Sequence, residues 1–133
     1  MGMIAIKKGA RPSEVKIFIN KKLYTMSISP GFLRKYNYNN INAKYIRLGL
    51  DKDNNEIGIE FLKEDDKSGE VMKLTYTSSG TAASFPIRSL ITMFSLNIKD
   101  IAGVYREKAI NGPKNIENFS KNGFILKINN RET

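Results

Sequence analysis

Residues 45–61 read YIRLGLDKDNNEIGIEF and contain the clearest strand and turn pattern in the chain. Tyr45 to Leu50 form a strand-like run, and every second residue from Ile57 to Phe61 is apolar, which is the period of a half-buried strand. The residues between the two runs, 51–55, are Asp, Lys and Asn, which favour turns. The stretch therefore predicts a β-hairpin.

Further strands and two short helices are expected on either side of this hairpin. The other expected strands are rich in apolar or β-branched residues and cover residues 15–19, 24–28, 72–76, 101–110 and 124–128. Ser29 and Pro30 suit the N-cap and first position of a short helix through Lys35, and helical spacing predicts a second helix over 87–96. The polar residues 111–122 are expected to form a loop.

The order of these elements suggests two similar halves. Strand, proline, short helix, strand, turn and strand follow one another from Met26 to Leu62, and again from Ala83 to Ile128. We expect one domain over residues 1–133, with halves at 1–62 and 71–130 joined by an acidic connector. The predicted class is α+β, strand-dominated, with two β-α-β-β halves that can pair into a small barrel. An α+β succession without internal symmetry is the alternative.

Composition excludes most kinds of active site. The chain has no histidine and no cysteine, so Ser-His-Asp and Cys-His mechanisms and thiolate metal sites are absent. The Ser78–Thr81 loop lacks the spacing of a phosphate-binding loop. Residues 51–56 lack the glycine and the final glutamate of a calcium loop. Glu64 to Asp66 have no catalytic partner that can be assigned. We therefore expect no enzyme, no cofactor and no metal.

No apolar run approaches the ~18 residues of a membrane span, and the N-terminus lacks the apolar core of a signal peptide. The chain is therefore expected to be cytoplasmic, with no membrane partner.

The charge is strongly positive and unevenly distributed. The net charge is +9. Residues 1–50 contain ten Lys or Arg and one acid, residues 51–70 contain three Lys and eight acids, and residues 71–133 contain nine Lys or Arg and four acids. Such asymmetry is typical of a basic face that meets a polyanion; a merely solubilising surface is the alternative.

Basic and aromatic residues are interleaved between residues 34 and 47. Arg and Lys neutralise phosphates, and Tyr rings can stack on unpaired bases. The candidate nucleic-acid-binding residues of this first group are Arg34, Lys35, Tyr36, Tyr38, Lys44 and Arg47. The tyrosines can instead be core residues that expose only their hydroxyls.

A second group of candidates lies near the N-terminus and along the first expected hairpin. It consists of Lys7, Lys8, Arg11, Lys16, Lys21 and Lys22, with Arg88 added from the second half. Lysines on a strand edge also block aggregation, which is the alternative role for each of them.

The segment Ile28-Ser29-Pro30-Gly31-Phe32-Leu33-Arg34 resembles the swapped-hairpin element of the AbrB, MazE and SpoVT transcription-factor superfamily. The second half repeats part of it as Phe85-Pro86-Ile87-Arg88, whereas Asn37-Tyr38 and Asn42-Ala43-Lys44 depart from the usual Leu-Gly and Gly-Asp. The resemblance implies a small barrel of two such elements, normally in a dimer, that binds DNA through basic residues. One chain containing both halves would be a single-chain pseudo-dimer.

These features predict a non-enzymatic DNA-binding protein, either a transcription regulator or a single-stranded DNA-binding protein, with DNA favoured over RNA. A homodimer or a single-chain pseudo-dimer is expected. The alternative is a protein-interaction module, such as an antitoxin or an inhibitor from a mobile genetic element or virus.

Overall fold

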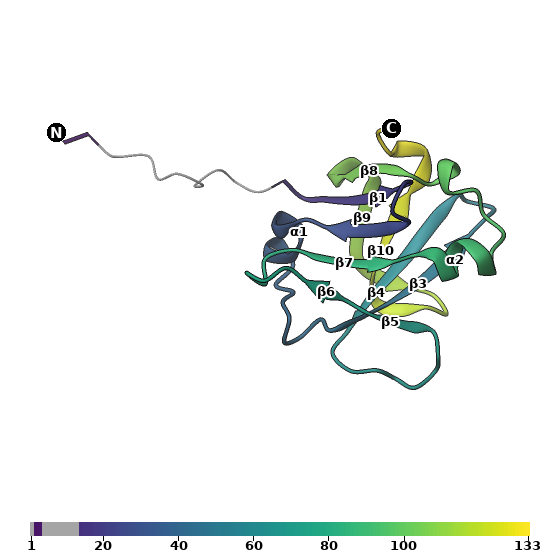
Figure 1. The fold of residues 1–133 in the computed structure, drawn as a ribbon, viewed down its shortest axis with the longest axis horizontal. Helices are drawn as coiled ribbons and strands as arrows, with labels where there is room; N and C mark the ends of the chain where they lie inside the picture. Colours follow the sequence, from purple (N-terminus) through teal and green to yellow (C-terminus); the bar gives the residue numbers. More distant parts are fainter. Residues whose placement is uncertain (1, 4–13) are drawn as a thin grey trace.

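The computed structural model describes residues 2–3 and 14–133, and Figure 1 shows their arrangement. They form two five-stranded antiparallel sheets connected by short helices and turns, which confirms the strand-dominated α+β class. The small barrel is not seen in this part of the chain. Sheet A ends at the edge strands β6 and β8, and sheet B ends at β5 and β9, so neither sheet closes on itself.

Sheet A has the strand order β6-β7-β2-β1-β8. Its strands are β1 (Lys16–Asn20), β2 (Thr25–Ile28), β6 (Thr75–Tyr76), β7 (Ala83–Pro86) and β8 (Gly103–Arg106). The predicted first hairpin is present as β1 and β2. Ile17 and Ile19 of β1 are fully buried, while Phe18 between them faces outward because strand side chains alternate.

Sheet B has the strand order β5-β3-β4-β10-β9. Its strands are β3 (Tyr45–Asp51), β4 (Glu56–Leu62), β5 (Val71–Lys73), β9 (Ile110–Ile116) and β10 (Ser120–Lys127). The hairpin predicted from residues 45–61 is confirmed as β3 and β4, in a register that places Arg47 opposite Glu60 and Gly49 opposite Gly58.

Three expectations about the second half were wrong. The strand expected over 72–76 is two strands, because β5 and β6 are separated at Leu74 and belong to different sheets. Residues 111–122 are not a loop, because β9 runs through them and pairs with β10. The strand expected over 101–110 is interrupted, since only β8 is extended there and the 3-10 turn η2 (Glu107–Ala109) separates it from β9. This turn carries the chain from sheet A to sheet B.

The helices are single short turns at the ends of sheet A. They are α1 (Pro30–Lys35) and α2 (Arg88–Met93), with 3-10 turns η1 (Ile98–Asp100), η2 and η3 (Ile128–Asn130). Figure 1 places α1 and α2 at opposite ends of the sheet. No helix in the described part of the chain is long and apolar enough to cross a bilayer.

The turn that ends α1 recurs at the end of α2. The amides of Tyr38 and Leu96 bond to the carbonyls of Leu33 and Ile91 at 2.8 and 2.9 Å. Residues 37 and 95 both adopt positive φ, at 59° and 51°. Asn39 and Asn97 each accept, through the side chain, from the amide two residues on, at 2.8 and 3.0 Å. The same local structure therefore appears at residues 33–41 and 91–99, although the N-caps of the two helices differ.

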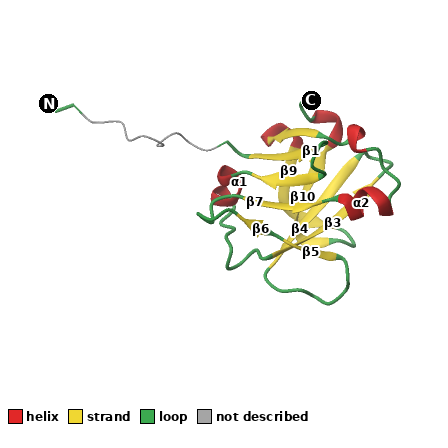
Figure 2. Ribbon diagram, in the orientation of Figure 1, coloured by secondary structure: helices red, strands yellow, loops and turns green. Residues whose placement is uncertain are grey.

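The core lies between the two sheets, as the layered arrangement in Figure 2 indicates. One buried cluster combines inward-facing residues of both sheets, including Ile17 and Phe85 of sheet A and Ile59 and Phe124 of sheet B. The faces turned away from this core are therefore the surfaces available for binding.

Candidate nucleic-acid interface

The net charge lies outside the segments that build sheet B. Residues 44–73 and 110–127, which build sheet B, contain nine Lys or Arg and nine acids. The rest of the chain contains thirteen Lys or Arg and four acids, which is the whole net charge of +9. Lys7, Lys8 and Arg11 lie outside the described residues, which leaves ten Lys or Arg and four acids for sheet A and its connections. A polyanion is therefore attracted to the described part of sheet A rather than to sheet B.

Phe18 is the middle residue of β1, on the outer face of sheet A. It pairs with Ser27 on one side and Val104 on the other, so its neighbours are smaller than its ring. Its exposed fraction is 38%, and it lines two adjacent grooves, of about 440 and 380 Å³. An aromatic ring with grooves on both sides can offer a face to a planar ligand.

The larger groove is basic at its rim. Lys21, Lys22 and Lys99 line it together with Phe18 and Asn20. All three lysines are exposed, and none has an acidic partner within 4.0 Å among the described residues. Free ammonium groups in this position can contact phosphates without first breaking an ion pair.

The β1–β2 turn holds two of these lysines in place. Asn20 Oδ1 accepts hydrogen bonds from the amides of Lys22 and Leu23, at 2.9 and 3.2 Å. The amide of Tyr24 closes the turn on the Asn20 carbonyl at 2.9 Å. Lys99 is positioned separately, because the Asn97 side chain caps η1 by accepting from the Lys99 amide.

Arg88 lies at the same end of sheet A as this turn. The amide of Ile87 bonds to the Tyr24 carbonyl at 2.9 Å, which fixes the start of α2 against the turn. The Arg88 guanidinium is 4.3 Å from the centre of the Tyr24 ring. Stacking of this kind leaves the guanidinium hydrogen atoms free to bind an anion. We call Phe18, Lys21, Lys22, Arg88 and Lys99 the sheet A surface.

Lys16 shares the outer face of sheet A but is paired. Its ammonium is 3.6 Å from Glu14, and Arg106 on the neighbouring strand bonds to both Glu14 and Glu132. The hydrogen bond from Arg106 holds the pKa of Glu14 below its ordinary value. The α1 end of this face is therefore closer to neutral than the opposite end.

The first predicted group is not a single site. Tyr36 packs against Phe32 and Phe124 with ring centroids 4.8 Å apart in both pairs, and Tyr38 packs 4.4 Å from Phe61. Both tyrosines are half-buried, and burial raises the pKa of Tyr38. Both rings pack largely against the core cluster, which agrees with the alternative interpretation that the tyrosines are core residues.

The basic members of that group are dispersed. Arg34 is exposed at the end of α1, and Lys44 is exposed beside a groove of about 380 Å³ that Lys73 and Tyr76 also line. Lys35 is 3.1 Å from Glu107, whose hydrogen bond holds the pKa of Lys35 above its ordinary value. Arg34 and Lys44 thus keep accessible charge, at the opposite end of sheet A from Lys21.

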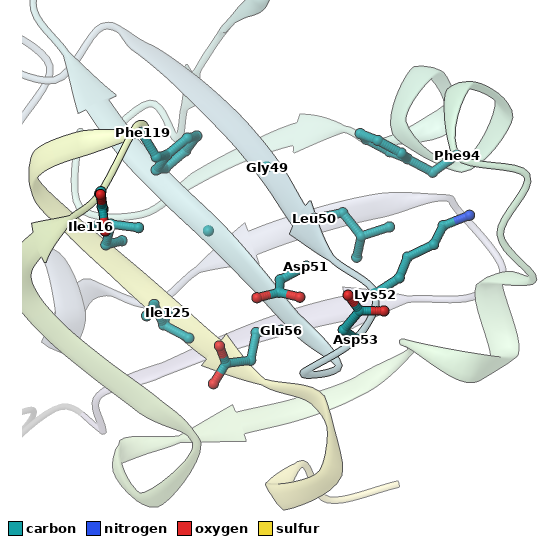
Figure 3. Close-up of a pocket in the computed structure, with 12 residues that line it drawn as sticks. Gly49, Leu50, Asp51, Lys52, Asp53, Glu56, Phe94, Ile116, Phe119 and Ile125 are labelled. Atoms are coloured by element: carbon teal, nitrogen blue, oxygen red, sulfur yellow. The ribbon is translucent and has the colours of Figure 1, made fainter.

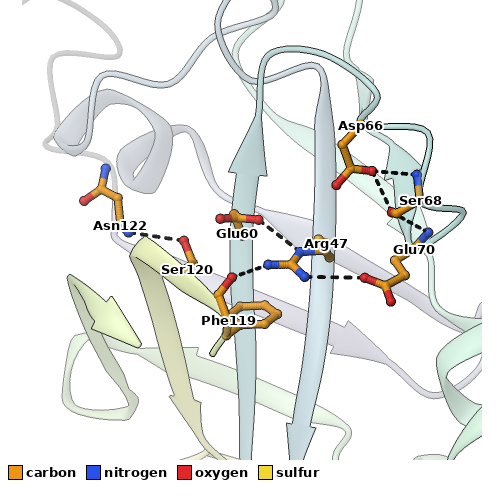
Figure 4. A network of polar contacts seen from close by, with 8 residues as sticks. All are labelled: Arg47, Glu60, Asp66, Ser68, Glu70, Phe119, Ser120 and Asn122. Carbon is orange, nitrogen blue, oxygen red and sulfur yellow. Dashed lines mark hydrogen bonds and ion pairs between the residues drawn. The ribbon is translucent and has the colours of Figure 1, made fainter. Parts of the chain in front are cut away.

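Arg47 is part of a structural network, which Figure 4 shows. Its guanidinium bonds to Glu60 at 3.0 Å, to Glu70 at 3.4 Å and to the Phe119 carbonyl, and it lies 4.5 Å from the centre of the Phe119 ring. Two carboxylates neutralise it, and only 20% of its side chain is exposed. In this structure Arg47 ties the acidic connector to sheet B.

The outer face of sheet B carries a different kind of groove, of about 610 Å³ (Figure 3). Gly49 and Gly58 form its floor beside Phe119, and apolar side chains come from Phe94, Ile116 and Ile125. Its charged lining residues are Asp51, Lys52, Asp53, Glu56 and Glu117. Four acids against one lysine make this groove unfavourable for a phosphate backbone.

Phe18 and Lys99 were missed by the sequence analysis. Phe18 was interpreted only as part of a strand, and the signal that could have identified it is a large aromatic on the polar side of an alternating run. Lys99 joins the groove only through tertiary structure. The predicted residues Lys7, Lys8 and Arg11 lie outside the described residues.

The described residues contain no group of three or more acids that could hold a metal ion. Comparison with protein-family models, with curated proteins and with solved structures found no match for this chain.

Proposed function

We propose that this protein is a non-enzymatic DNA-binding protein that contacts DNA through the sheet A surface. The observation that carries the proposal is the division of charge, with the whole +9 outside the segments that build sheet B. Unpaired Lys21, Lys22 and Lys99 and the stacked Arg88 are the accessible cations on the described part of that surface.

The order of elements also supports a single-chain pseudo-dimer. β2 pairs with β7 and β4 pairs with β10, so corresponding strands of the two halves meet in each sheet. The shared cap structure of α1 and α2 favours the same relation. This arrangement is consistent with two swapped-hairpin elements like those of the AbrB, MazE and SpoVT superfamily, joined in one chain.

The proposal is tested by a salt titration of DNA binding. If about six phosphates are contacted, the log-log slope of affinity against salt is −4 to −5, and affinity falls roughly a thousandfold between about 50 and 200 mM salt. Fluorescence anisotropy with a labelled oligonucleotide measures this directly. A dependence on salt that is flat over this range contradicts the proposal.

A protein-interaction module is the second candidate, and the groove on sheet B favours it. Apolar residues with an acidic rim suit a partner segment that combines apolar and basic side chains. An antitoxin or an inhibitor could use such a groove. Replacing Asp51, Asp53 and Glu56 by their amides would then weaken partner binding and leave DNA binding unchanged.

A further inference from the structure

Phe18 is unusual among the outward-facing residues of sheet A. The others described on β1, β2 and β7 are Lys16, Asn20, Thr25, Ser27, Ser84 and Pro86. A large aromatic on such a face contributes little to the core, because 38% of it stays exposed and the buried side chains of β1 are Ile17 and Ile19. Its ring is therefore available to a ligand.

The surroundings of Phe18 define the shape of that ligand. Grooves lie on both sides of the ring, one lined by Lys21, Lys22 and Lys99 and the other by Lys16 and Ser29. Lys16 begins β1 and Lys21 directly follows its last residue, so the two are five residues apart, roughly 16 Å at 3.3 Å per residue. A ligand that follows β1 meets the Phe18 ring midway and Lys21, unpaired among the described residues, at one end, whereas Lys16 at the other end is paired with Glu14.

We propose that the sheet A surface binds single-stranded nucleic acid in preference to duplex, with an unpaired base stacked on Phe18 and the backbone held by Lys21, Lys22 and Lys99. The inference rests on the proposed function. A duplex keeps its bases stacked on one another and presents phosphates to a flat sheet, so only its contacts with the lysines contribute to its binding free energy. For a single strand, both the lysines and the Phe18 ring contribute to the binding free energy.

The first test compares variants with single-stranded DNA of about 16 nucleotides and the duplex of the same sequence. Phe18→Leu keeps apolar bulk and removes the aromatic face. It is expected to lower single-strand affinity between about fivefold and a hundredfold and to leave duplex affinity unchanged. Leu23→Ala is the matched control, because Leu23 is an exposed apolar residue of the neighbouring turn, and it changes neither affinity.

The outcomes separate the two proposals. If wild-type protein binds both DNAs and Phe18→Leu changes both affinities equally, or changes neither, the stacking inference is wrong while DNA binding stands. If wild-type protein binds neither DNA, the proposed function fails. Melting temperatures of all variants show whether any loss of affinity comes from unfolding.

A spectroscopic test needs no comparison of affinities. The chain contains no tryptophan, so Phe18→Trp introduces a single indole at the proposed stacking position. Saturation with single-stranded DNA is expected to quench its fluorescence, and the same saturation is expected to leave Leu23→Trp nearly unchanged. Equal quenching of the two variants, or none in Phe18→Trp, would overturn the assignment.

Discussion

The Phe119 ring packs against Gly49 and Gly58 of sheet B. A Cβ added at Gly49 or Gly58 would lie 3.0 or 3.1 Å from the Phe119 ring, so the ring occupies the space that these residues leave empty. Arg47 covers the same ring, which joins the glycine pair to the network around the acidic connector.

This contact predicts energetic coupling between the glycine and the ring. Gly58→Ala should be less favourable in the wild-type chain than in a Phe119→Leu background, with a coupling of about 0.5–3 kcal/mol, because the new methyl group crowds the ring only when the ring is present. Urea unfolding of the two single variants and the double variant measures the coupling. Additive effects would show that the ring does not fill this space.

Tyr76 predicts a loss of stability at alkaline pH. Its hydroxyl donates to the carbonyls of Asn39 and Ala43, and burial raises its pKa from 10.0 to about 12. Between these values the unfolded chain loses the phenolic proton while the folded chain keeps it, so stability present below pH 10 is lost as the pH rises towards 12.

The measurement is the free energy of unfolding from pH 9 to 12 for wild-type protein and Tyr76→Phe. The wild-type curve should fall more steeply, since the variant has no phenol to titrate at this position. Parallel curves would mean that Tyr76 titrates alike in the folded and unfolded chains.

At the scale of the element, the shared cap structure of α1 and α2 makes a comparative prediction. Asn37 and Ser95 occupy the same left-handed position, at φ 59° and 51°. Asparagine tolerates this conformation better than serine, and glycine adopts it without penalty. Ser95→Gly should therefore stabilise the protein by about 0.5–1 kcal/mol, and Asn37→Gly by less. Thermal unfolding of both variants tests this, and a larger gain at residue 37 would contradict it.

The same scale shows what the sequence could and could not predict. The β3–β4 hairpin was predictable because Ile57, Ile59 and Phe61 face the core and alternate with outward residues. β9 was not, because it is an edge strand with mostly exposed residues and its pairing with β10 comes from tertiary structure. There Gly112 approaches so closely that a Cβ would lie 2.7 Å from the Gly123 carbonyl.

Of the candidate site, only Lys21, Lys22 and Arg88 were predictable from the sequence. Sequence reasoning grouped Tyr36 and Tyr38 with neighbouring cations. Interleaving along the chain does not reveal that Tyr36 packs on Phe32 and Phe124 and that Tyr38 packs on Phe61. Arg47 was grouped with them for the same reason, and its carboxylate partners lie on other strands and loops.

At the scale of the whole molecule, the proposed pseudo-dimer places both halves within one chain. Corresponding strands already pair inside this chain, so no second copy is needed to complete either sheet. Sedimentation equilibrium should therefore give the 15.1 kDa mass of one chain. A stable dimer at micromolar concentration would contradict the single-chain pseudo-dimer.

Matched removal of charge tests whether the sheet A surface binds DNA. One variant replaces Lys21, Lys22 and Lys99 by Gln, and the control replaces Lys52, Lys63 and Lys67, which are exposed on the turns of sheet B. Both lose the same net charge. The slope of log affinity against log salt should become shallower by about two to three units in the first variant and stay unchanged in the control. Equal slopes for the two variants would contradict DNA binding at this surface.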